Sequence, residues 1–217
     1  MVIKINKIVK ESFVDGPGAR TVVFLQGCSI HCPGCQNKKL QDPQYGFYYD
    51  VLELSERLAF LSVSHGNVTI SGGEPFDQPK ELAMLVIALR KNGVKNIVVY
   101  TGYQWANLIS GISGKLLWNH EVLSRIDTLV DGPYIMSLDS DSLSFRGSYN
   151  QMFINVTESL KAPAASIILD DRMANIQVQI SNEGSIILPA ALSSDFDGIG
   201  ELLESRMCGQ TAESIRG

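Results

Sequence analysis

Three cysteines near the N-terminus carry the most direct chemical information in this sequence. Cys28, Cys32 and Cys35 follow the pattern C-x3-C-x2-C, and the fourth cysteine, Cys208, lies far away near the C-terminus. Thiolates are the protein ligands of iron–sulfur clusters, and a complete cubane normally takes four of them. Three local thiolates therefore predict a [4Fe–4S] cluster with one iron free to bind a group that is not protein.

Three other interpretations of the cysteines stay open. A structural zinc site needs four closed ligands; His31 is a poor fourth beside Cys32, and Cys208 could serve only if the C-terminal segment folds back. A fully ligated electron-transfer cluster is a second alternative, although the familiar ferredoxin spacings differ. Ordinary buried cysteines are the third, and the polar surroundings rich in glycine and proline disfavour them. The spacing favours the open cluster.

Two glycine-rich segments flank this chemistry. Ser71-Gly72-Gly73-Glu74-Pro75 and the upstream Asp15-Gly16-Pro17-Gly18-Ala19-Arg20 both have the composition of tight turns. Paired glycines let the backbone approach a ligand closely and adopt positive φ. A plain connection between a strand and a helix is the competing interpretation for each segment.

The elements that must position these residues alternate between strand and helix. Short β-rich apolar runs occur at residues 21–25, 67–71, 96–100 and 128–130. Helical patterns begin after Asp50 and at Pro79, and a third, interrupted by glycines, spans roughly residues 104–126. Asp50 and Glu53 have capping-box spacing, and Gly93 is placed to end the second helix. This alternation predicts an α/β protein with a mostly parallel sheet, open or curled into a barrel.

The last third of the chain has a different pattern. Residues 176–180 alternate between apolar and polar side chains, a polar turn follows, and residues 185–188 resume the β-rich pattern, which is typical of a β-hairpin. A short terminal helix is expected at about residues 198–207. We therefore expect a core domain over residues 1–160 and a C-terminal extension of unknown role over residues 161–217.

Size, composition and charge exclude some classes of function. A chain of 217 residues with 45% hydrophobic and 19% charged residues suits one domain with a small appendage. The formal net charge of −5 argues against a protein that coats nucleic acid. The first residues lack the apolar stretch of a secretory signal, and no run approaches the ~20 apolar residues that cross a bilayer. We expect a cytoplasmic protein with no membrane or nucleic-acid partner.

Taken together, these residues resemble the radical S-adenosylmethionine (SAM) superfamily, and within it the activating enzymes of anaerobic ribonucleoside-triphosphate reductase. The resemblance spans roughly residues 8–155. The motifs that carry it are Asp15-Gly16-Pro17-Gly18, Phe24-Leu25-Gln26-Gly27-Cys28, Cys32-Pro33-Gly34-Cys35-Gln36-Asn37, Ser71-Gly72-Gly73-Glu74-Pro75, Tyr100-Thr101-Gly102-Tyr103, Leu129-Val130-Asp131-Gly132 and Arg146-Gly147-Ser148-Tyr149-Asn150-Gln151.

The resemblance implies a fold and a set of cofactors. The fold is a partial (β/α)6-type radical SAM barrel, here followed by the small C-terminal hairpin and helix. The cofactors are a [4Fe–4S] cluster on Cys28, Cys32 and Cys35 and a SAM molecule that chelates the open iron. The implied SAM contacts are the backbone of Gly72 and Gly73 for the methionine part, Gly34, Cys35 and Gln36 for the adenosyl part, and Glu74 and Thr101 nearby.

Glu74, Asn37 and the segment Arg146–Gln151 each have a structural interpretation beside the functional one. Glu74 can contact SAM or cap the following turn, and Asn37 can orient the adenosine or its own loop. Residues Arg146–Gln151 can shape a channel for the partner or hold the edge of the barrel. Lys38 and Lys39 can bind an acidic electron donor or belong to a solvated patch.

The resemblance also implies a partner, and it leaves alternatives. The 5′-deoxyadenosyl radical would remove a Cα hydrogen from a glycine of a glycyl-radical enzyme, with a flavodoxin- or ferredoxin-type protein as electron donor. Pro33-Gly34 and the Arg-Gly-Ser-x-Asn-Gln segment favour anaerobic ribonucleotide reductase as that enzyme. The alternatives are another client such as pyruvate formate-lyase, a small-molecule or peptide substrate as in the carboxy-deazaguanine synthases, and a non-catalytic metal-binding module.

Overall fold

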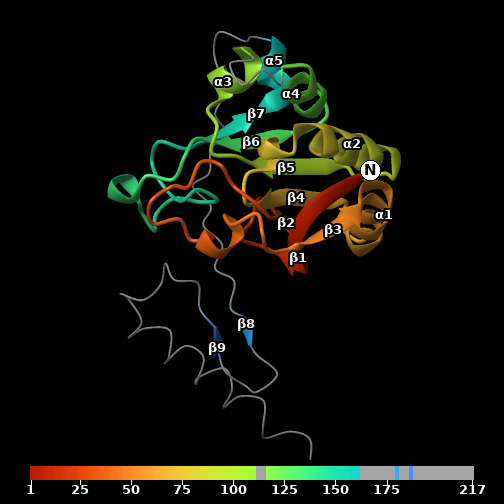
Figure 1. Cartoon of the computed structure of the whole chain (residues 1–217), viewed down its shortest axis with the longest axis horizontal. Coiled ribbons are helices and arrows are strands. Elements are labelled where there is room, and N and C mark those ends of the chain that lie inside the picture. Colours follow the sequence, from red (N-terminus) through yellow and green to blue (C-terminus); the bar gives the residue numbers. More distant parts are fainter. Residues whose placement is uncertain (111–115, 162–178, 181–185, 188–217) are drawn as a thin grey trace, which may run out of the picture. The chain divides into compact units, whose positions relative to one another are not determined.

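The computed structural model describes residues 1–110, 116–161, 179–180 and 186–187. Seven strands form one sheet in the order β3-β1-β2-β4-β5-β6-β7 (Figure 1). The strands are β1 (Val2–Ser12), β2 (Arg20–Leu25), β3 (Phe47–Asp50), β4 (Asn67–Gly72), β5 (Asn96–Tyr100), β6 (Thr128–Asp131) and β7 (Met152–Asn155). The helices are α1 (Val51–Leu61), α2 (Pro79–Lys91), α3 (Trp105–Ser110), α4 (Leu116–Leu123) and α5 (Val156–Lys161), with short 3-10 helices η1 (Lys38–Leu40), η2 (Pro75–Asp77) and η3 (Met136–Leu138).

The sheet is parallel only at its centre. Strands β2, β4, β5 and β6 pair in parallel, whereas β1, β3 and β7 join antiparallel at the two sides. The expectation of a mostly parallel sheet therefore holds for the four central strands and not for the flanks. Two hydrogen bonds join the ends of the connection from β6 to the antiparallel β7: the Asn150 side chain donates to Pro133 O at 2.7 Å and that of Gln151 to Gly132 O at 2.9 Å.

The predicted helices form for the reasons that their sequences indicate. The Asp50 side chain caps α1 by accepting hydrogen bonds from the backbone N–H groups of Leu52 and Glu53, at 2.9 and 3.3 Å. Pro79 begins α2, and Gly93, at φ +85°, follows its end. The glycine-interrupted pattern after residue 104 becomes two short helices, α3 and α4.

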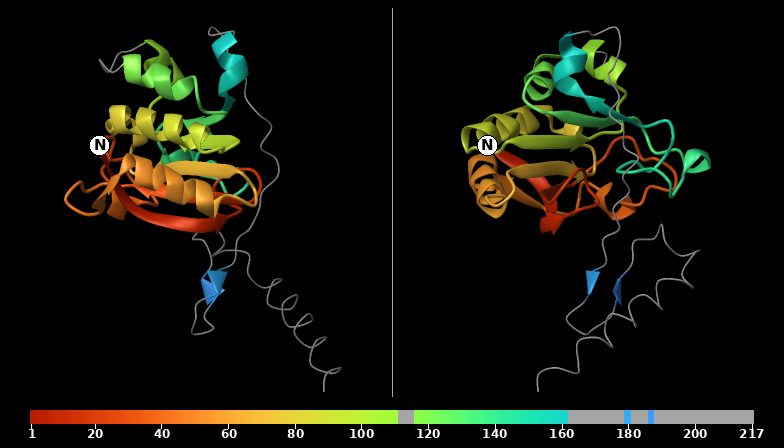
Figure 2. Two further views of the ribbon diagram at one scale, coloured as in Figure 1. Left: turned by 90° about the vertical axis from the view of Figure 1, so that its right-hand side faces the viewer. Right: turned by 180° about the vertical axis from the view of Figure 1, so that it is seen from behind.

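The main hydrophobic core lies between the helices and one face of the sheet. Helices α1, α2 and α4 stand next to one another along that face (Figure 2). The fully buried side chains there include Ile5, Leu25, Ile70, Leu85 and Ile97. Each such side chain contributes about 1.5–3 kcal/mol to stability by leaving water. This layer therefore fixes the positions of the strands and of the loops at their carboxyl ends.

The turn before β2 is held by a buried arginine. Arg20 is 1% exposed, and its guanidinium donates to Thr69 Oγ1 at 2.7 Å, Val68 O at 3.0 Å and Asn96 Oδ1 at 2.8 Å. It also donates to Pro17 O within the turn, at 2.9 Å. The Asp15–Arg20 motif therefore ties the beginning of β2 to β4 and β5.

The chain divides into two units, residues 1–176 and 177–217. In the second unit, β8 (Gln179–Ile180) pairs antiparallel with β9 (Ile186–Ile187), where the sequence predicts a hairpin. The helix expected at residues 198–207 and Cys208 lie outside the described residues. Among the helices that the structure describes, none is long and apolar enough to span a membrane.

Candidate active site

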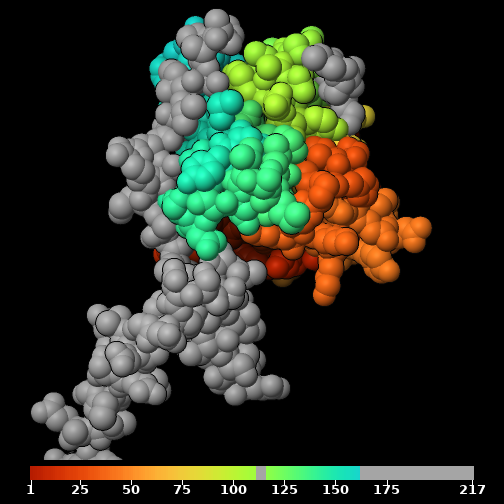
Figure 3. Space-filling model, turned by 90° about the vertical axis from the view of Figure 1, so that its left-hand side faces the viewer, coloured from red at the N-terminus to blue at the C-terminus, as the bar shows by residue number. Residues whose placement is uncertain are grey.

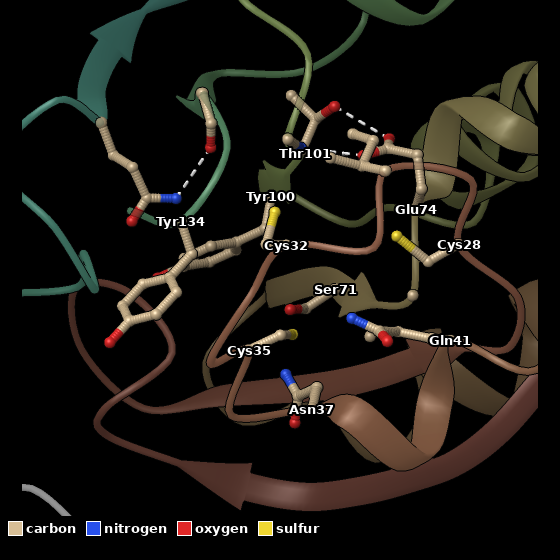
Figure 4. Close-up of a pocket in the computed structure, with 16 residues that line it drawn as sticks. Cys28, Cys32, Cys35, Asn37, Gln41, Ser71, Glu74, Tyr100, Thr101 and Tyr134 are labelled. Carbon is tan, nitrogen blue, oxygen red and sulfur yellow. Dashed lines mark hydrogen bonds between the residues drawn. The ribbon is translucent and has the colours of Figure 1, made fainter. Parts of the chain in front are cut away.

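A pocket opens at the carboxyl edge of the four parallel strands. Each central strand contributes the loop that follows it, which is where α/β proteins usually place reactive groups. The lining side chains and backbone are shown in Figure 4 and come from Cys28, Ile30, Cys32, Cys35, Asn37, Gln41, Ser71, Gly72, Gly73, Glu74, Tyr100, Thr101, Gly102, Gly132, Tyr134 and Gln151. The three clustered cysteines, both glycines of the pair, Glu74 and Thr101 thus meet in one place.

The three thiols are free and half-buried. They point into the pocket from different sides (Figure 4). Within the part of the chain that the structure describes, no three cysteine, histidine or acidic side chains are grouped tightly enough to hold a single metal ion. Burial raises the pKa of the Cys28 thiol above its usual value of 9.0, and the nearby carboxylates of Glu74 and Asp77 also raise it. Ligation at Cys28 must therefore displace a proton.

The cysteine loop begins on a backbone scaffold supplied by η1. Gly27 takes φ +95°, and its N–H donates to Leu40 O at 2.8 Å. The next N–H, that of Cys28, donates to Gln41 O at 3.0 Å. These bonds fix the direction in which the first thiol leaves β2.

The glycine pair after β4 packs directly against this scaffold. The N–H of Gly73 donates to Leu25 O at 2.9 Å, and that of Glu74 donates to Gly27 O at 2.8 Å. A Cβ added to Gly73 would lie 2.0 Å from Gly27 O, and one added to Gly72 would lie 2.3 Å from Leu25 N. The close backbone approach that the sequence predicts is therefore present, and it brings the β4 turn beside the cysteines.

Glu74 acts within the protein as a bridge between two loops. It is 1% exposed, and its carboxylate accepts hydrogen bonds from Phe76 N, Thr101 Oγ1 and Gly102 N, each at 2.8 Å. The bond from Phe76 is the capping interaction that the sequence offered as one alternative. The bonds from Thr101 and Gly102 join the β4 loop to the β5 loop, which the sequence pattern does not predict.

Burial gives Glu74 a pH-dependent effect on stability. Burial raises its pKa from 4.5 to about 7, against the opposing effect of the three hydrogen bonds. Because the pKa is higher in the folded state, its stabilising contribution is complete below about pH 4.5 and is lost as the pH rises through 7. We expect the free energy of unfolding of the cluster-free protein, measured in urea, to fall by an amount on the order of 3 kcal/mol across that window because of this residue.

The matched variant for this prediction is Glu74→Gln, which cannot ionise. Asp15 and Asp131, whose pKa values burial also raises, are present in both proteins and cancel in the comparison. Stability curves of wild type and variant that stay parallel between pH 4.5 and 8 would contradict the prediction.

A second network, which the sequence pattern does not predict, anchors the cysteine loop from outside. Asp77 accepts from Ser29 N at 2.6 Å through one carboxylate oxygen, and from Ser29 Oγ at 2.8 Å and Tyr103 Oη at 3.1 Å through the other. Ser29 directly follows Cys28. Asp77 therefore positions the first thiol, although it does not line the pocket.

We expect Asp77→Ala to weaken retention of the cluster about three- to tenfold. The reason is that hydrogen bonds to an ionised group contribute about 1.5–3 kcal/mol, less at exposed sites such as this one. The measurement is the rate of iron release to a chelator under anaerobic conditions. Asp42→Ala is the matched control, because Asp42 also accepts a backbone hydrogen bond, from Gln44 at 2.8 Å, without touching the cysteine loop. Equal release rates for the two variants would show that Asp77 has no such role.

Two of the predicted SAM contacts do not line this pocket. Gly34 lies against the connection between β6 and β7, where an added Cβ would be 3.1 Å from Met136 Sδ and 3.3 Å from Tyr134 Cε1. Gln36 lines a separate hollow beyond the cysteine loop. The connection itself forms a lobe (green) beside the segment that carries the cysteines (orange) in Figure 3.

Residues 146–151 hold that lobe in shape. The Arg146 guanidinium donates to Gln151 O at 2.8 Å, and Gln151 Oε1 accepts from Gly147 N at 2.8 Å. Gln151 also lines the pocket, as do Ser71, Tyr100, Gln41 and Tyr134, which were not predicted as site residues. Ser71, Tyr100 and Gln151 lie in motifs that the sequence already singles out, whereas Gln41 and Tyr134 give no such signal.

The residues present fit an iron–sulfur cluster with a second ligand beside it. The donor set is three thiols on one loop, which is the ligand type that such clusters take. The Gly72-Gly73 turn lines the same pocket, and its backbone packs against that of Leu25 and Gly27.

Comparison with known proteins agrees with this site. Residues 14–154 match the family described as 4Fe–4S single cluster domain. The anaerobic ribonucleoside-triphosphate reductase-activating protein of Enterobacteria phage T4 is 30% identical over 159 residues, which cover 71% of this chain and 96% of the relative. The pyruvate formate-lyase-activating enzyme of Clostridium pasteurianum is 34% identical over 108 residues, 48% of this chain and 45% of the relative. The crystal structure of QueE from Escherichia coli is 23% identical, covers 47% of this chain and 53% of that one, and has a TM-score of 0.35.

The thiol-bearing pocket and the family match define a single-cluster iron–sulfur enzyme of the radical SAM class, with a [4Fe–4S] cluster and SAM as its cofactors. Within that class, the chain belongs to the family of anaerobic ribonucleoside-triphosphate reductase-activating proteins.

Proposed function

We propose that this protein installs a glycyl radical on an anaerobic ribonucleoside-triphosphate reductase. The observation that carries the proposal is the pocket in which three thiols of one loop face the Gly72-Gly73 turn. Relatives that align over almost their whole length are named as activating proteins of that reductase.

In this proposal Cys28, Cys32 and Cys35 hold the [4Fe–4S] cluster, and the backbone of Gly72 and Gly73 receives the methionine part of SAM. A cluster and SAM bound there would supply the hydrogen-abstracting radical chemistry that the reaction at a glycine Cα of the partner requires. Glu74 positions the β4 and β5 loops relative to each other through Thr101 and Gly102. Tyr134 and Gln151 form the wall of the pocket on the β6 side.

The finer features of the fold belong to the same proposal. A sheet that curls into a partial (β/α)6-type barrel would leave one side open, and a partner's glycine loop could enter there. Residues 1–160 would form this core, with residues 161–217 as an extension. A flavodoxin- or ferredoxin-type protein in the cytoplasm would supply the electron.

A second client is supported by one observation. The pyruvate formate-lyase-activating enzyme of Clostridium pasteurianum is 34% identical over the part that aligns. Both candidate clients accept the same hydrogen abstraction, so the pocket alone does not separate them. The shorter alignment, which spans 45% of that relative against 96% of the phage protein, favours the reductase.

The test is electron paramagnetic resonance of each candidate client. The anaerobically reconstituted protein is mixed with SAM, dithionite and either the reductase or pyruvate formate-lyase. We expect a glycine-centred radical on the reductase and none on a reductase variant whose radical glycine is replaced by alanine.

Other outcomes distinguish the alternatives. A signal on pyruvate formate-lyase alone would transfer the proposal to the second client. SAM cleavage that a metabolite accelerates, with no radical on either client, would favour a small-molecule substrate. Failure to cleave SAM under reduction would overturn the proposal altogether.

A further inference from the structure

A second hollow lies directly beyond the cysteine loop and shares Asn37 with the active pocket. Its lining is Asn6, Lys7, Gln36, Asn37, Lys38, Lys39, Leu40, Asp42 and Tyr45. Its volume is about 1030 Å3. Pockets for small ligands occupy about 300–1,000 Å3, so this hollow is at or beyond their upper limit.

Three lysines give the hollow a positive charge. Lys7, Lys38 and Lys39 are exposed, and Asp42 is the only acidic residue among the described lining. No described carboxylate forms an ion pair with Lys38 or Lys39. Because the whole chain carries a formal charge of −5, this positive surface is a local feature, and it attracts an acidic partner.

Hydrogen bonds hold the lysine-bearing segment against the residues that lead from β2 to the first thiol. Gln26, which is 2% exposed, donates from Nε2 to Lys39 O at 3.1 Å and to Asp42 O at 2.7 Å. The following residues, Leu40 and Gln41, accept the backbone hydrogen bonds of Gly27 and Cys28 described above. A partner on this surface would therefore contact the segment whose carbonyl groups hold Gly27 and Cys28.

We infer that the lysine surface, defined as Lys7, Lys38 and Lys39, docks an acidic one-electron carrier protein. The inference rests on the proposed function, since that reaction requires an electron and leaves the mouth of the active pocket to the client's glycine loop. In the docked complex, one electron leaves the carrier's reduced group, and the cluster's charge falls from 2+ to 1+. No proton or bond moves in this step.

The test compares two charge-reversal pairs in the cluster-loaded protein. Lys38→Glu with Lys39→Glu removes the proposed surface. Lys91→Glu with Lys95→Glu makes the same change in charge at the opposite ends of the strands, where α2 ends and β5 begins. The probe is a flavodoxin, an acidic carrier. Its dissociation constant is measured by calorimetry at low and high salt, and the rate at which its reduced form reduces the cluster is followed by absorbance.

We expect the first pair to weaken flavodoxin binding and to slow reduction by flavodoxin at least about tenfold, and to flatten the dependence on salt. The control pair should stay within about twofold of wild type. Reduction by dithionite and the SAM cleavage that it drives should be unchanged in both. The dithionite result separates the inference from the proposed function. A protein without the proposed function would not cleave SAM with dithionite either, whereas a protein that lacks only the docking surface would.

Two results would overturn the inference. One is equal flavodoxin binding and equal reduction rates in the two pairs. The other is that wild type binds tripolyphosphate tightly and that Lys38→Glu with Lys39→Glu abolishes this binding without changing reduction by flavodoxin. That result would make the hollow a site for a small anion.

Discussion

Replacing Gly73 with alanine is expected to destabilise the protein by about 3 kcal/mol or more and to prevent loading of the cluster. The new Cβ would lie 2.0 Å from Gly27 O and 3.0 Å from Leu40 O. Both are backbone atoms held by hydrogen bonds, so no side-chain rotation relieves the overlap. The β4 turn must then move away from the cysteine loop. Urea denaturation and iron analysis after anaerobic reconstitution measure the two effects.

Gly93→Ala is the matched control for this change. Gly93 has φ +85°, and an added Cβ would meet nothing within 4 Å. Its cost is therefore that of the left-handed backbone alone, about 1–2 kcal/mol. Gly73 lies outside the left-handed region, so its requirement is for space alone. A Gly73→Ala protein as stable as the Gly93 variant, with a full complement of iron, would show that the two loops are not in close contact.

Single substitutions of Cys28, Cys32 or Cys35 by serine are expected to remove the iron–sulfur absorption and to reduce SAM cleavage to background. Each thiol is one of only three on the pocket wall, and the described residues supply no fourth cysteine. Serine keeps the size of the side chain but is not the thiolate ligand that such clusters take. Visible absorption, iron and sulfide content and the yield of 5′-deoxyadenosine are the measurements.

The control is Cys208→Ser, which changes the cysteine outside the described residues. We expect it to bind iron and cleave SAM as wild type does. Loss of the cluster in Cys208→Ser would mean that the site is closed by a fourth protein ligand, and the open-iron interpretation would be wrong.

The central part of the fold follows from the sequence. The apolar runs of β2, β4, β5 and β6 and the capped patterns of α1 and α2 are each confirmed within a residue or two. The flanking strands β1, β3 and β7 are not predicted. The exposed four-residue β3 takes its conformation from pairing with β1, and strand propensity depends strongly on such neighbours.

The candidate site divides in the same way. Residues at or shortly after the end of a parallel strand, such as Cys28, Gly72 and Thr101, are predictable because the carboxyl ends of those strands share one edge. Tyr134 and Asp77 are not, because their places depend on long-range hydrogen bonds of the β6–β7 connection and of the Ser29 loop. The spacing of apolar residues along the sequence carries no information about such bonds.

The pocket draws its lining from residues 28 to 151, which sets the order of events during synthesis. At translation rates of about 5–20 residues per second, Gln151 leaves the ribosome roughly 6 to 23 seconds after Cys35. During that interval the nascent thiols have no wall on the β6 side. We therefore expect the complete site to form only after Gln151 has emerged, so that the nascent thiols are open to oxidants and zinc ions before then.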